Sequence, residues 1–400
     1  MSNTSQITHN AIKVGITGQT GFVGTHLYNT LGLYPYIYER IPFEDAFFQN
    51  DEILEEFVKN CDVIVHLAAM NRHNDPEVIY QTNLGLVKQL IAVCEKTNST
   101  PHIIFSSSTQ EERDNLYGKS KKEGRQLFEQ WAERNQARFT GLVIPNVFGP
   151  FGNPYYNSVI TTFCHQLTHN ETPKIEIDGE IKLIYVGELV NEIIKAISNE
   201  PLAVSSQISD HSSQITDYSL QFTHHVSNTS TIKVFDLLNK LTEFKTNYFE
   251  KGEIPSLENT FEKNLFNTFL CYIDHQTFFP FMLKKNTDAR GSFIETVKLN
   301  SGGQVSFSRT VSGITRGNHF HTRKAERFAV IKGKALIELR RIGTNEVLSF
   351  ELDGEYPSFV DMPIWYTHNI KNIGEEELYT IFWINEHYNA DDPDTFFETV

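Results

Sequence analysis

The first half of the chain alternates short apolar runs with longer segments in which apolar residues recur at helical spacing. The run IKVGIT at residues 12–17 is followed by FVGTHLYNTLG at residues 22–32, which predicts a strand and then a helix. Strands that alternate with helices form βαβ units and a parallel sheet. Further strands are predicted at YIYE, DVIVHLAA and HIIFSSS, residues 36–39, 62–69 and 102–108, and a closing helix at residues 184–197.

The pattern changes after Phe278. Short segments of alternating apolar and polar residues follow one another there, which is typical of antiparallel strands in a barrel or sandwich. The predicted strands are GQVSFSRT, FAVIKGKALIELRRI, VLSFEL and LYTIFWI, at residues 303–310, 328–342, 347–352 and 378–384. The expected fold class is therefore an α/β, doubly wound parallel sheet followed by an all-β barrel or sandwich.

Three stretches fall outside these two patterns. Residues 1–11 are polar and predict an N-terminal tail. Residues 205–231 are rich in Ser, Thr, His and Gln without sustained periodicity, so we expect a variable insertion, either a loop or a hairpin. Residues 234–270 carry helical patterns and predict a helical bridge. The expected domains are residues 12–277, which include the insertion and the bridge, and residues 278–400.

Composition limits what these domains can do. The chain has 400 residues, of which 40% are hydrophobic, so it is large enough for two buried cores. Its formal net charge of -15 argues against non-specific binding of nucleic acid. We find no leader and no run of roughly 18 apolar residues that would span a membrane, so we expect a cytoplasmic protein. The four cysteines lie far apart, which favours buried thiols in a reducing compartment: Cys61, Cys94, Cys164 and Cys271.

The segment GITGQTGFVG places glycines between the first predicted strand and the first predicted helix. There Gly18, Gly21 and Gly24 let the backbone approach a pyrophosphate, which the helix N-terminus stabilises with its free N–H groups. The spacing differs from the commoner dinucleotide fingerprint, and a glycine-rich turn that binds nothing is the alternative. Arg40, after the second strand, favours NADPH through its 2′-phosphate, although Glu39 is adjacent.

A second motif, FSSSTQEERDNLYGKSKKEGRQLF, combines a tyrosine and a lysine on a predicted helix. Tyr117 and Lys121 are four residues apart, so the phenol and the ammonium share a face. A nearby ammonium favours the phenolate, which suits a proton donor to a carbonyl that receives hydride. A serine hydroxyl from the end of the preceding strand can bond to the same carbonyl oxygen. In isolation, the pair would be read as surface residues.

Together these motifs resemble the extended short-chain dehydrogenase/reductase family, which has a Rossmann-like fold. The resemblance rests on Gly-x-x-Gly-x-x-Gly, HLAA, FSSS and Tyr-x-x-x-Lys in the family's order, over residues 12–197. It implies that Tyr117 donates the proton, that Lys121 positions the ribose and that Ser108 polarises the carbonyl. The interval from Ser108 to Tyr117 is shorter than usual, which leaves the choice among Ser107, Ser108 and Thr109 open. The substrate contacts that the resemblance implies are Asn146 and Asn157.

Histidines and a glutamate form a third candidate site in the C-terminal half. His319 and His321 alternate on a predicted strand, Glu326 follows a short turn, and His368 can return from a later strand. Three imidazoles and one carboxylate suit Zn²⁺, and also Fe²⁺, Mn²⁺ or Ni²⁺. The spacing of Gly313, His319, His321, Glu326 and Gly333 resembles the first half of the cupin signature, which implies an all-β jelly-roll barrel. The later Pro-x-Trp-x-x-His-x-x-x-Asn, which contains His368, resembles the second half, except that cupins often have glycine at Trp365. We expect one divalent metal, with zinc as the first choice.

Two segments near this site, DARGSFIE at residues 288–295 and GITRGNH at residues 313–319, resemble segments of the deoxysugar epimerases, which are cupins that act on 4-keto sugars. The resemblance implies that His319 is the general base and that Arg290 and Arg316 contact the substrate. His319 would then be both base and ligand, yet a ligated imidazole does not easily accept a proton. The nearby cations can form a solvated face or meet a pyrophosphate: Arg309, Arg316, Arg323 and Arg327.

The order of the two domains, reductase and then cupin, resembles the CapF-type enzymes of capsular polysaccharide synthesis over nearly the whole chain. The segments YNSVITTFC, RGSF, YTHNI and DPDTFFETV carry this resemblance. It implies epimerisation and then NADPH-dependent reduction of UDP-2-acetamido-2,6-dideoxy-hexos-4-ulose to UDP-N-acetyl-6-deoxy-L-talosamine, on the route to N-acetylfucosamine. We also expect a homodimer, because cupin edge strands often pair.

Two alternatives stay open. The same folds can reduce a different 4-keto sugar while the cupin is purely structural. The chain can also be a non-enzymatic, dinucleotide-sensing scaffold, which the presence of Tyr117 and Lys121 opposes.

Overall fold

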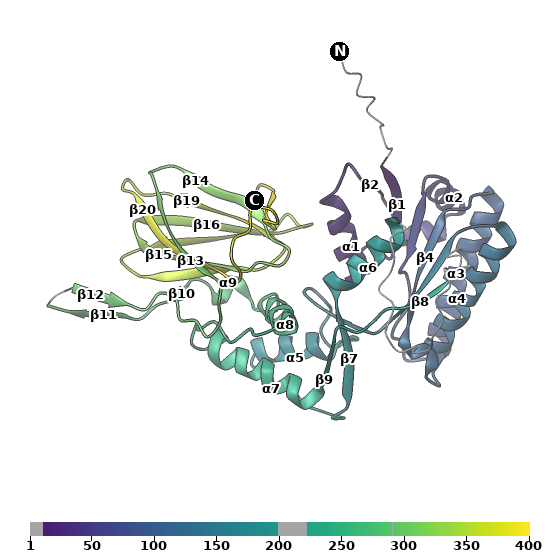
Figure 1. Ribbon diagram of the computed structural model, residues 1–400, viewed down its shortest axis with the longest axis horizontal. Helices are drawn as coiled ribbons and strands as arrows, with labels where there is room; N and C mark the ends of the chain where they lie inside the picture. Colours follow the sequence, from purple (N-terminus) through teal and green to yellow (C-terminus); the bar gives the residue numbers. More distant parts are fainter. Residues whose placement is uncertain (1–10, 199–221, 290) are drawn as a thin grey trace, which may run out of the picture. The chain divides into compact units, whose positions relative to one another are not determined.

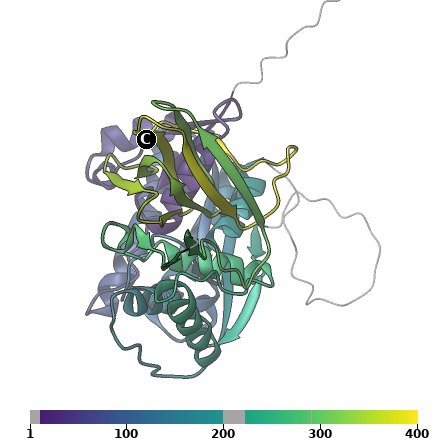
Figure 2. The same cartoon turned by 90° about the vertical axis from the view of Figure 1, so that its left-hand side faces the viewer.

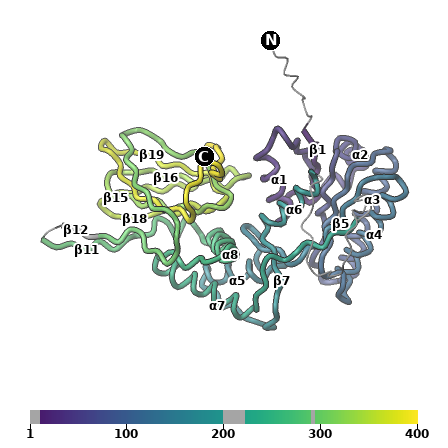
Figure 3. Tube along the Cα trace, in the orientation of Figure 1, coloured from purple at the N-terminus to yellow at the C-terminus, as the bar shows by residue number. Residues whose placement is uncertain are grey.

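The computed structural model describes residues 11–198, 222–289 and 291–400 (Figures 1 and 3). The contacts divide the chain into two compact units. The first comprises the described residues up to Phe148 and those from Ile181 to Thr231, and the second comprises Gly149–Glu180 and Ile232–Val400. Most of the predicted tail, most of the predicted insertion and Arg290 lie outside the described residues. The boundary between residues 277 and 278 remains a prediction about sequence modules, since by its contacts the helical bridge belongs to the second unit.

The first unit is built on a six-stranded parallel sheet with strand order β2-β1-β3-β4-β5-β8 (Figure 1). Helices follow the strands, as the alternating pattern predicts. The strands are β1 (Ile12–Thr17), β2 (Tyr38–Ile41), β3 (Val63–His66), β4 (His102–Ser108), β5 (Phe139–Ile144) and β8 (Thr223–His225). The helices are α1 (Phe22–Gly32), α2 (Asp51–Lys59), α3 (Pro76–Thr97), α4 (Leu116–Asn135) and α6 (Val186–Ser198), with short 3-10 turns η1 (Asp45–Gln49) and η2 (Thr109–Glu112).

Two local predictions for this unit were wrong. Strand β2 begins at Tyr38, two residues later than predicted, because the chain still turns after helix α1. The C-terminal end of the predicted insertion is not irregular: β8 adds to the main sheet beside β5, and β9 (Ser230–Lys233) begins within it. These strands have three and four residues, too few for alternation to be visible in a sequence. A smaller sheet joins β6 (Asn146–Phe148), β7 (Glu180–Tyr185) and β9.

Helix α4, which carries the predicted Tyr-Lys pair, starts at a well-defined cap. The side chain of Asn115 accepts a hydrogen bond of 2.7 Å from the backbone N–H of Gly118. Gly118 also lets the helix lie directly against η2, since a Cβ at this position would lie only 2.0 Å from the carbonyl oxygen of Gln110. The start of α4 is therefore fixed against the end of strand β4.

The second unit combines helices with two antiparallel sheets of five strands each, and Figure 2 looks onto it. One sheet has the order β10-β18-β15-β20-β13 and the other β17-β16-β19-β14-β21. Thirteen buried apolar residues, among them Val330, Ile337 and Phe359, form one core cluster of this unit. The β11–β12 hairpin projects away from the sheets (Figures 1 and 3).

The strands of this unit are β10 (Phe281–Met282), β11 (Lys285–Asp288), β12 (Gly291–Ile294), β13 (Gln304–Thr310), β14 (Thr315–Phe320), β15 (Glu326–Lys332), β16 (Lys334–Arg341), β17 (Val347–Asp353), β18 (Ser358–Met362), β19 (Tyr366–Asn372), β20 (Leu378–Ile384) and β21 (Phe396–Phe397). The helices are α5 (Val159–Thr168), α7 (Val234–Phe244), α8 (Thr260–Leu270) and α9 (His275–Phe278), with a π-turn at Lys245–Phe249. The fold class expected from the sequence, a parallel α/β domain followed by an antiparallel all-β domain, is confirmed. Among the described helices, none is long and apolar enough to cross a membrane.

A buried ion pair joins the helical bridge to the sheets of the second unit. Arg327 on β15 is 1% exposed and donates to both carboxylate oxygens of Asp361 on β18, at 2.8 and 2.9 Å. A third nitrogen contact of Arg327 goes to the carbonyl oxygen of Gly252 at 2.6 Å, and the hydroxyl of Tyr248 donates to Asp361 at 2.6 Å. Arg327 is therefore neither part of a solvated face nor available to a pyrophosphate, and the bridge supplies half of its partners.

Removing one partner of this pair should be costly, because the remaining charge stays buried without compensation. We expect Asp361→Ala to lower the free energy of unfolding by about 3–5 kcal/mol. Denaturant titration of the full chain, followed by tryptophan fluorescence, measures this loss. The control is Glu376→Ala, which breaks an exposed pair with Lys332 and should leave stability unchanged. A loss for Asp361→Ala no larger than that of the control would contradict the expectation.

Candidate functional site

The glycine-rich turn between β1 and α1 leaves room only for backbone. Gly18 has a φ of 72°, and a Cβ there would lie 2.8 Å from the backbone nitrogen of Ala68. A Cβ on Gly24 would lie 2.2 Å from the carbonyl oxygen of Gly18. The turn therefore packs tightly against the segment after β3 and opens α1 without a side-chain cap. A free helix N-terminus behind a tight glycine turn is the geometry that binds a dinucleotide pyrophosphate.

Arg40 does not lie level with this turn. It pairs with Val14 in the β1–β2 register, three residues before Thr17, or about 10 Å along a strand. Its guanidinium lies over the ring of Tyr28, 4.2 Å from the centroid, and donates to the Tyr28 carbonyl oxygen at 3.2 Å. The contact with a 2′-phosphate therefore stays a prediction, and in this conformation Arg40 packs on helix α1.

Tyr117 and Lys121 lie one turn apart on α4, with the Lys121 ammonium nitrogen 5.9 Å from the centre of the tyrosine ring. Lys121 is 4% exposed and donates to the carbonyl oxygen of Ser106 at 2.9 Å. Burial lowers the pKa of Lys121 to about 8, while the charge of Glu111 opposes this shift. A buried ammonium beside a phenol can stabilise the phenolate and hold a proton relay in place.

The three serines at the end of β4 differ in what holds their hydroxyl groups. Ser107 is buried and donates a short hydrogen bond to Glu111, which also receives two bonds from Arg125 at 3.0 and 2.8 Å. Ser108 is only half-buried, and its oxygen accepts a bond of 3.2 Å from the backbone N–H of Gln110. The Ser107 proton is therefore already used in a hydrogen bond to Glu111, which is paired with Arg125. The Ser108 proton is donated to no other described group.

Sequence reasoning missed Glu111 and Arg125. Both lie within the motif segment at residues 105–128, but they are 14 positions apart and neither is one of the residues that define the motif. Arg125 also binds Glu129 at 2.7 Å and the hydroxyl of Thr223 at 2.8 Å, so the network extends to strand β8. Only the fold brings these side chains together around the end of β4.

The three described residues predicted to contact the substrate are all exposed, but they lie on different elements and in both units. Asn146 is exposed on β6, and its amide donates to the carbonyl oxygen of Lys182 at 3.1 Å. Asn157 is exposed in the loop before α5 in the second unit. Arg316 is exposed on β14 but turned toward β13, where it donates to the hydroxyl of Thr310 at 3.0 Å. Their roles stay predictions.

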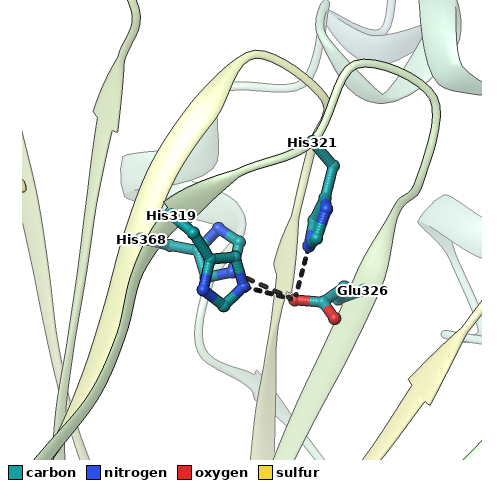
Figure 4. Close-up of side chains that lie close together, drawn as sticks. All are labelled: His319, His321, Glu326 and His368. Atoms are coloured by element: carbon teal, nitrogen blue, oxygen red, sulfur yellow. Dashed lines mark hydrogen bonds and ion pairs between the residues drawn. The ribbon is translucent and has the colours of Figure 1, made fainter. Parts of the chain in front are cut away.

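The third candidate site is compact. His319, His321, Glu326 and His368 each offer a ligand atom, and these atoms lie within 4.8 Å of one another (Figure 4). The Glu326 Oε2 atom is the common neighbour, at 3.0 Å from His368 Nε2, 3.4 Å from His321 Nε2 and 3.9 Å from His319 Nε2. The four residues come from three neighbouring segments, with His319 directly opposite His368 in the β14–β19 register. Three imidazoles and a carboxylate around one point form a donor set for a divalent metal.

The side chains of this cluster differ in their tendency to hold a proton. Burial lowers the pKa of His321, but Glu326 and Asp394 outweigh burial and raise that pKa overall. Burial alone would raise the pKa of Glu326, but the three imidazoles around its carboxylate hold that pKa well below its usual range. Burial lowers the pKa of His368, which favours its neutral form. His321 Nε2 is buried and makes no hydrogen bond to any described group. An ionised carboxylate with an unbonded, buried imidazole nitrogen is the state in which such side chains accept a cation.

Trp365 occupies the position at which cupins often have glycine, and its backbone explains that preference. Its φ of 62° lies in the left-handed region. The indole ring stacks on Phe320 at 5.6 Å, a contact that glycine cannot make. This contact favours Trp365 in a conformation that otherwise costs of order 1 kcal/mol.

Comparison with known proteins assigns the whole chain. Two family models match: the NAD dependent epimerase/dehydratase family over residues 14–205 and the polysaccharide biosynthesis C-terminal domain over residues 286–396. The UDP-2-acetamido-2,6-beta-L-arabino-hexul-4-ose reductase of Pseudomonas aeruginosa is 30% identical over 390 residues, 96% of this chain and 98% of that protein. CapF, the capsular polysaccharide assembling protein of Staphylococcus aureus, has 33% sequence identity to this chain. Its crystal structure matches with a TM-score of 0.60, and the match covers 97% of this chain and 100% of that chain. The chain belongs to the CapF family.

A shorter relative matches only part of the chain. The spore coat polysaccharide biosynthesis protein SpsL of Bacillus subtilis is 28% identical over 122 residues, which cover 28% of this chain and 81% of that protein. Membership of the CapF family, together with the epimerase/dehydratase match, makes the chain an NAD(P)-dependent enzyme.

His66, at the end of β3, makes the stability of the folded chain depend on pH. It is 1% exposed, and its Nδ1 shares a hydrogen bond of 2.7 Å with the hydroxyl of Thr17. Burial, assisted by the charge of Lys121, lowers the pKa of His66 to about 3 from 6.5. Between these pH values the unfolded chain binds a proton here that the folded chain does not. The stability present above pH 6.5 is therefore lost as the pH falls toward 3.

We expect His66→Gln to flatten this dependence. Between pH 6 and pH 4, the free energy of unfolding of the variant should fall less steeply than that of the wild type, by about 1.4 kcal/mol per pH unit. Denaturant titrations at several pH values measure both slopes. His102 is also buried with its pKa lowered to about 3, so His102→Gln should flatten the slope independently. Parallel slopes for wild type and His66→Gln would show that His66 is not neutral in the folded chain.

Proposed function

We propose that this CapF-family chain converts UDP-2-acetamido-2,6-dideoxy-hexos-4-ulose to UDP-N-acetyl-6-deoxy-L-talosamine, on the route to UDP-N-acetyl-L-fucosamine for capsule or O-antigen. The observation that carries the proposal is the full-length likeness to the Pseudomonas aeruginosa reductase. In the proposal, the cupin domain first inverts the carbon next to the ketone, and the first domain then reduces the ketone with NADPH. We also propose that the chain works as a homodimer in the cytoplasm.

The reductive half of the reaction rests on the side chains around the end of β4. Bound NADPH supplies the hydride. In this proposal the Ser108 hydroxyl donates to the substrate carbonyl oxygen, and Tyr117 protonates that oxygen as it becomes an alkoxide. The Lys121 ammonium, held by the Ser106 carbonyl oxygen, favours the phenolate that remains on Tyr117.

The order of the two steps follows from the substrate's chemistry. A ketone acidifies the adjacent C–H bond, so a base can remove that proton and return it on the opposite face. Reduction of the ketone removes this acidity. Epimerisation therefore precedes reduction, whichever domain performs it.

The role proposed for the cluster of His319, His321, Glu326 and His368 is to hold one divalent metal, with zinc as the first choice. Such a cation supplies Lewis acidity to an enolate oxygen or stabilises the barrel. His319 cannot be a ligand and a free base at once, because a ligated Nε2 has no free lone pair. Its Nε2 belongs to the donor set around Glu326, which supports the ligand role. In that case another group removes the substrate proton.

The division of labour can be tested with Tyr117→Phe. Hydride transfer should fall at least about 100-fold, because the alkoxide loses its proton donor, while exchange of the proton next to the ketone should persist. The two assays are NADPH absorbance and solvent deuterium incorporation by NMR, run on the same UDP-4-keto sugar. Tyr80→Phe is the control, since the Tyr80 hydroxyl binds Glu123 on the helix surface.

Two outcomes of this experiment would contradict parts of the proposal. If folded Tyr117→Phe loses exchange as completely as reduction, both steps belong to one site and the cupin assignment is wrong. If the wild type reduces the sugar without any exchange, the cupin is structural and the substrate is a different 4-keto sugar. Absence of NADPH turnover with all such sugars would favour the non-enzymatic scaffold.

The choice among the serines gives a second, separate prediction. Ser108→Ala should lower kcat about 100-fold, because a donor to the carbonyl oxygen is lost. Ser107→Ala should instead remove a hydrogen bond to Glu111 and act on stability, by about 1 kcal/mol, with kcat little changed. Steady-state kinetics and thermal unfolding of both variants separate these effects. A large loss of kcat in Ser107→Ala alone would reverse the assignment.

A further inference from the structure

The C-terminal segment folds back onto the short turn between β14 and β15. That turn, residues 322–325, separates two of the candidate metal ligands, His321 and Glu326. Asp394 is buried beneath it, and its carboxylate accepts hydrogen bonds from three consecutive backbone N–H groups and one hydroxyl. These are Thr322 N at 3.1 and 3.2 Å, Thr322 Oγ1 at 2.6 Å, Arg323 N at 3.0 Å and Lys324 N at 3.2 Å.

The same residue also contacts a candidate ligand through its main chain. The carbonyl oxygen of Asp394 accepts a short hydrogen bond from His321 Nδ1. A carbonyl oxygen only accepts, so Nδ1 must carry the proton. In the neutral imidazole the lone pair then lies on Nε2. Nε2 is the atom that lies 3.4 Å from Glu326 Oε2, within the donor set.

Asp394 therefore reaches the candidate metal centre twice, once through its side chain and once through its carbonyl oxygen. Its φ of 42° is left-handed, a conformation that Asp tolerates better than most residues. The carboxylate shapes the turn that sets the spacing from His321 to Glu326. The carbonyl oxygen fixes the tautomer and the ring orientation of His321. Partners of this kind, beyond the ligands themselves, commonly govern metal affinity.

We propose that Asp394, in the C-terminal segment, is a positioning residue of the metal centre. The proposal rests on the proposed function only in that the four side chains hold a divalent cation. Asp394 touches neither cation nor substrate. It acts by holding His321 and the ligand-bearing turn in the arrangement that binds the cation, so the last residues of the chain determine how tightly a site some 70 residues earlier binds its metal.

The variant that tests this is Asp394→Asn in the full chain. Asn keeps the size of the side chain, but its amide NH₂ replaces an oxygen that accepts from Thr322, Arg323 and Lys324. The amide must therefore oppose backbone N–H groups or turn away, and the turn loosens. We expect the dissociation constant for Zn²⁺, measured by competition with a chromophoric chelator, to rise about 10- to 100-fold. The absorption spectrum of bound Co²⁺ should change as well, because the ligand geometry changes.

The matched control is Asp392→Asn. Asp392 lies two residues away on the same segment and binds the exposed guanidinium of Arg323 at 2.9 Å, so it tests loss of a tail contact without loss of the turn contacts. Its Zn²⁺ affinity and Co²⁺ spectrum should match those of the wild type. If Asp394→Asn does not fold, Thr322→Val removes only the hydroxyl bond to Asp394 and should still weaken Zn²⁺ binding measurably.

The outcomes distinguish the positioning role of Asp394 from the metal centre itself. Wild-type affinity and spectrum in folded Asp394→Asn, or in Thr322→Val if Asp394→Asn does not fold, would overturn the positioning role while leaving the metal centre intact. Equal weakening in the Asp392 control would overturn it too, since any loosening of the segment would then suffice. A wild-type chain that binds neither Zn²⁺ nor Co²⁺ would instead refute the metal centre itself.

Discussion

A polar group removed from water must be given a partner inside the protein. The Tyr117–Lys121 pair, the histidine cluster and the join between the helical bridge and the β-sheets all depend on that constraint. Lys121 is held by a main-chain carbonyl oxygen, Arg327 by Asp361, and the Nδ1 of His321 by Asp394. These partners fix the direction in which each side chain points. The Nε2 of His321 lacks a described hydrogen bond, and it faces the point where the proposed cation would lie.

Much of the architecture could be predicted from local pattern. Alternation of strand and helix predicted the parallel sheet, the alternating strands after residue 278 predicted the antiparallel domain, and motif spacing located Tyr117 beside Lys121. The four candidate ligands were also found from their spacing. His319 and His321 alternate along one predicted strand, and the two halves of the cupin signature include Glu326 and His368. These features succeed because each is encoded within a few residues or in a fixed interval.

What the sequence did not predict are pairings between distant residues. No period or fixed interval relates Glu111 to Arg125, Arg327 to Asp361 or Thr322 to Asp394, and each pair meets only after the chain has folded. Arg40 shows the reverse problem. Its position after the strand predicted at residues 36–39 indicated a phosphate contact, but Arg40 lies within β2 beside Val14, and its side chain packs on Tyr28. The position of a residue along a strand does not determine where the charged group of a long side chain lies.

The buried pair of Arg327 and Asp361 sets a limit on how this chain can be divided. Two further partners of this pair, Tyr248 and the carbonyl oxygen of Gly252, come from the helical bridge, ahead of the first strand of the β-sheets. A fragment that starts at residue 278 would lack Tyr248 and Gly252, and the charged groups of Arg327 and Asp361 would be exposed to water. A piece suited to separate expression, or to fusion with another protein, therefore needs the bridge from near Ile232 and also Gly149–Glu180, which belong to the same compact unit, although the matching family model begins only at residue 286.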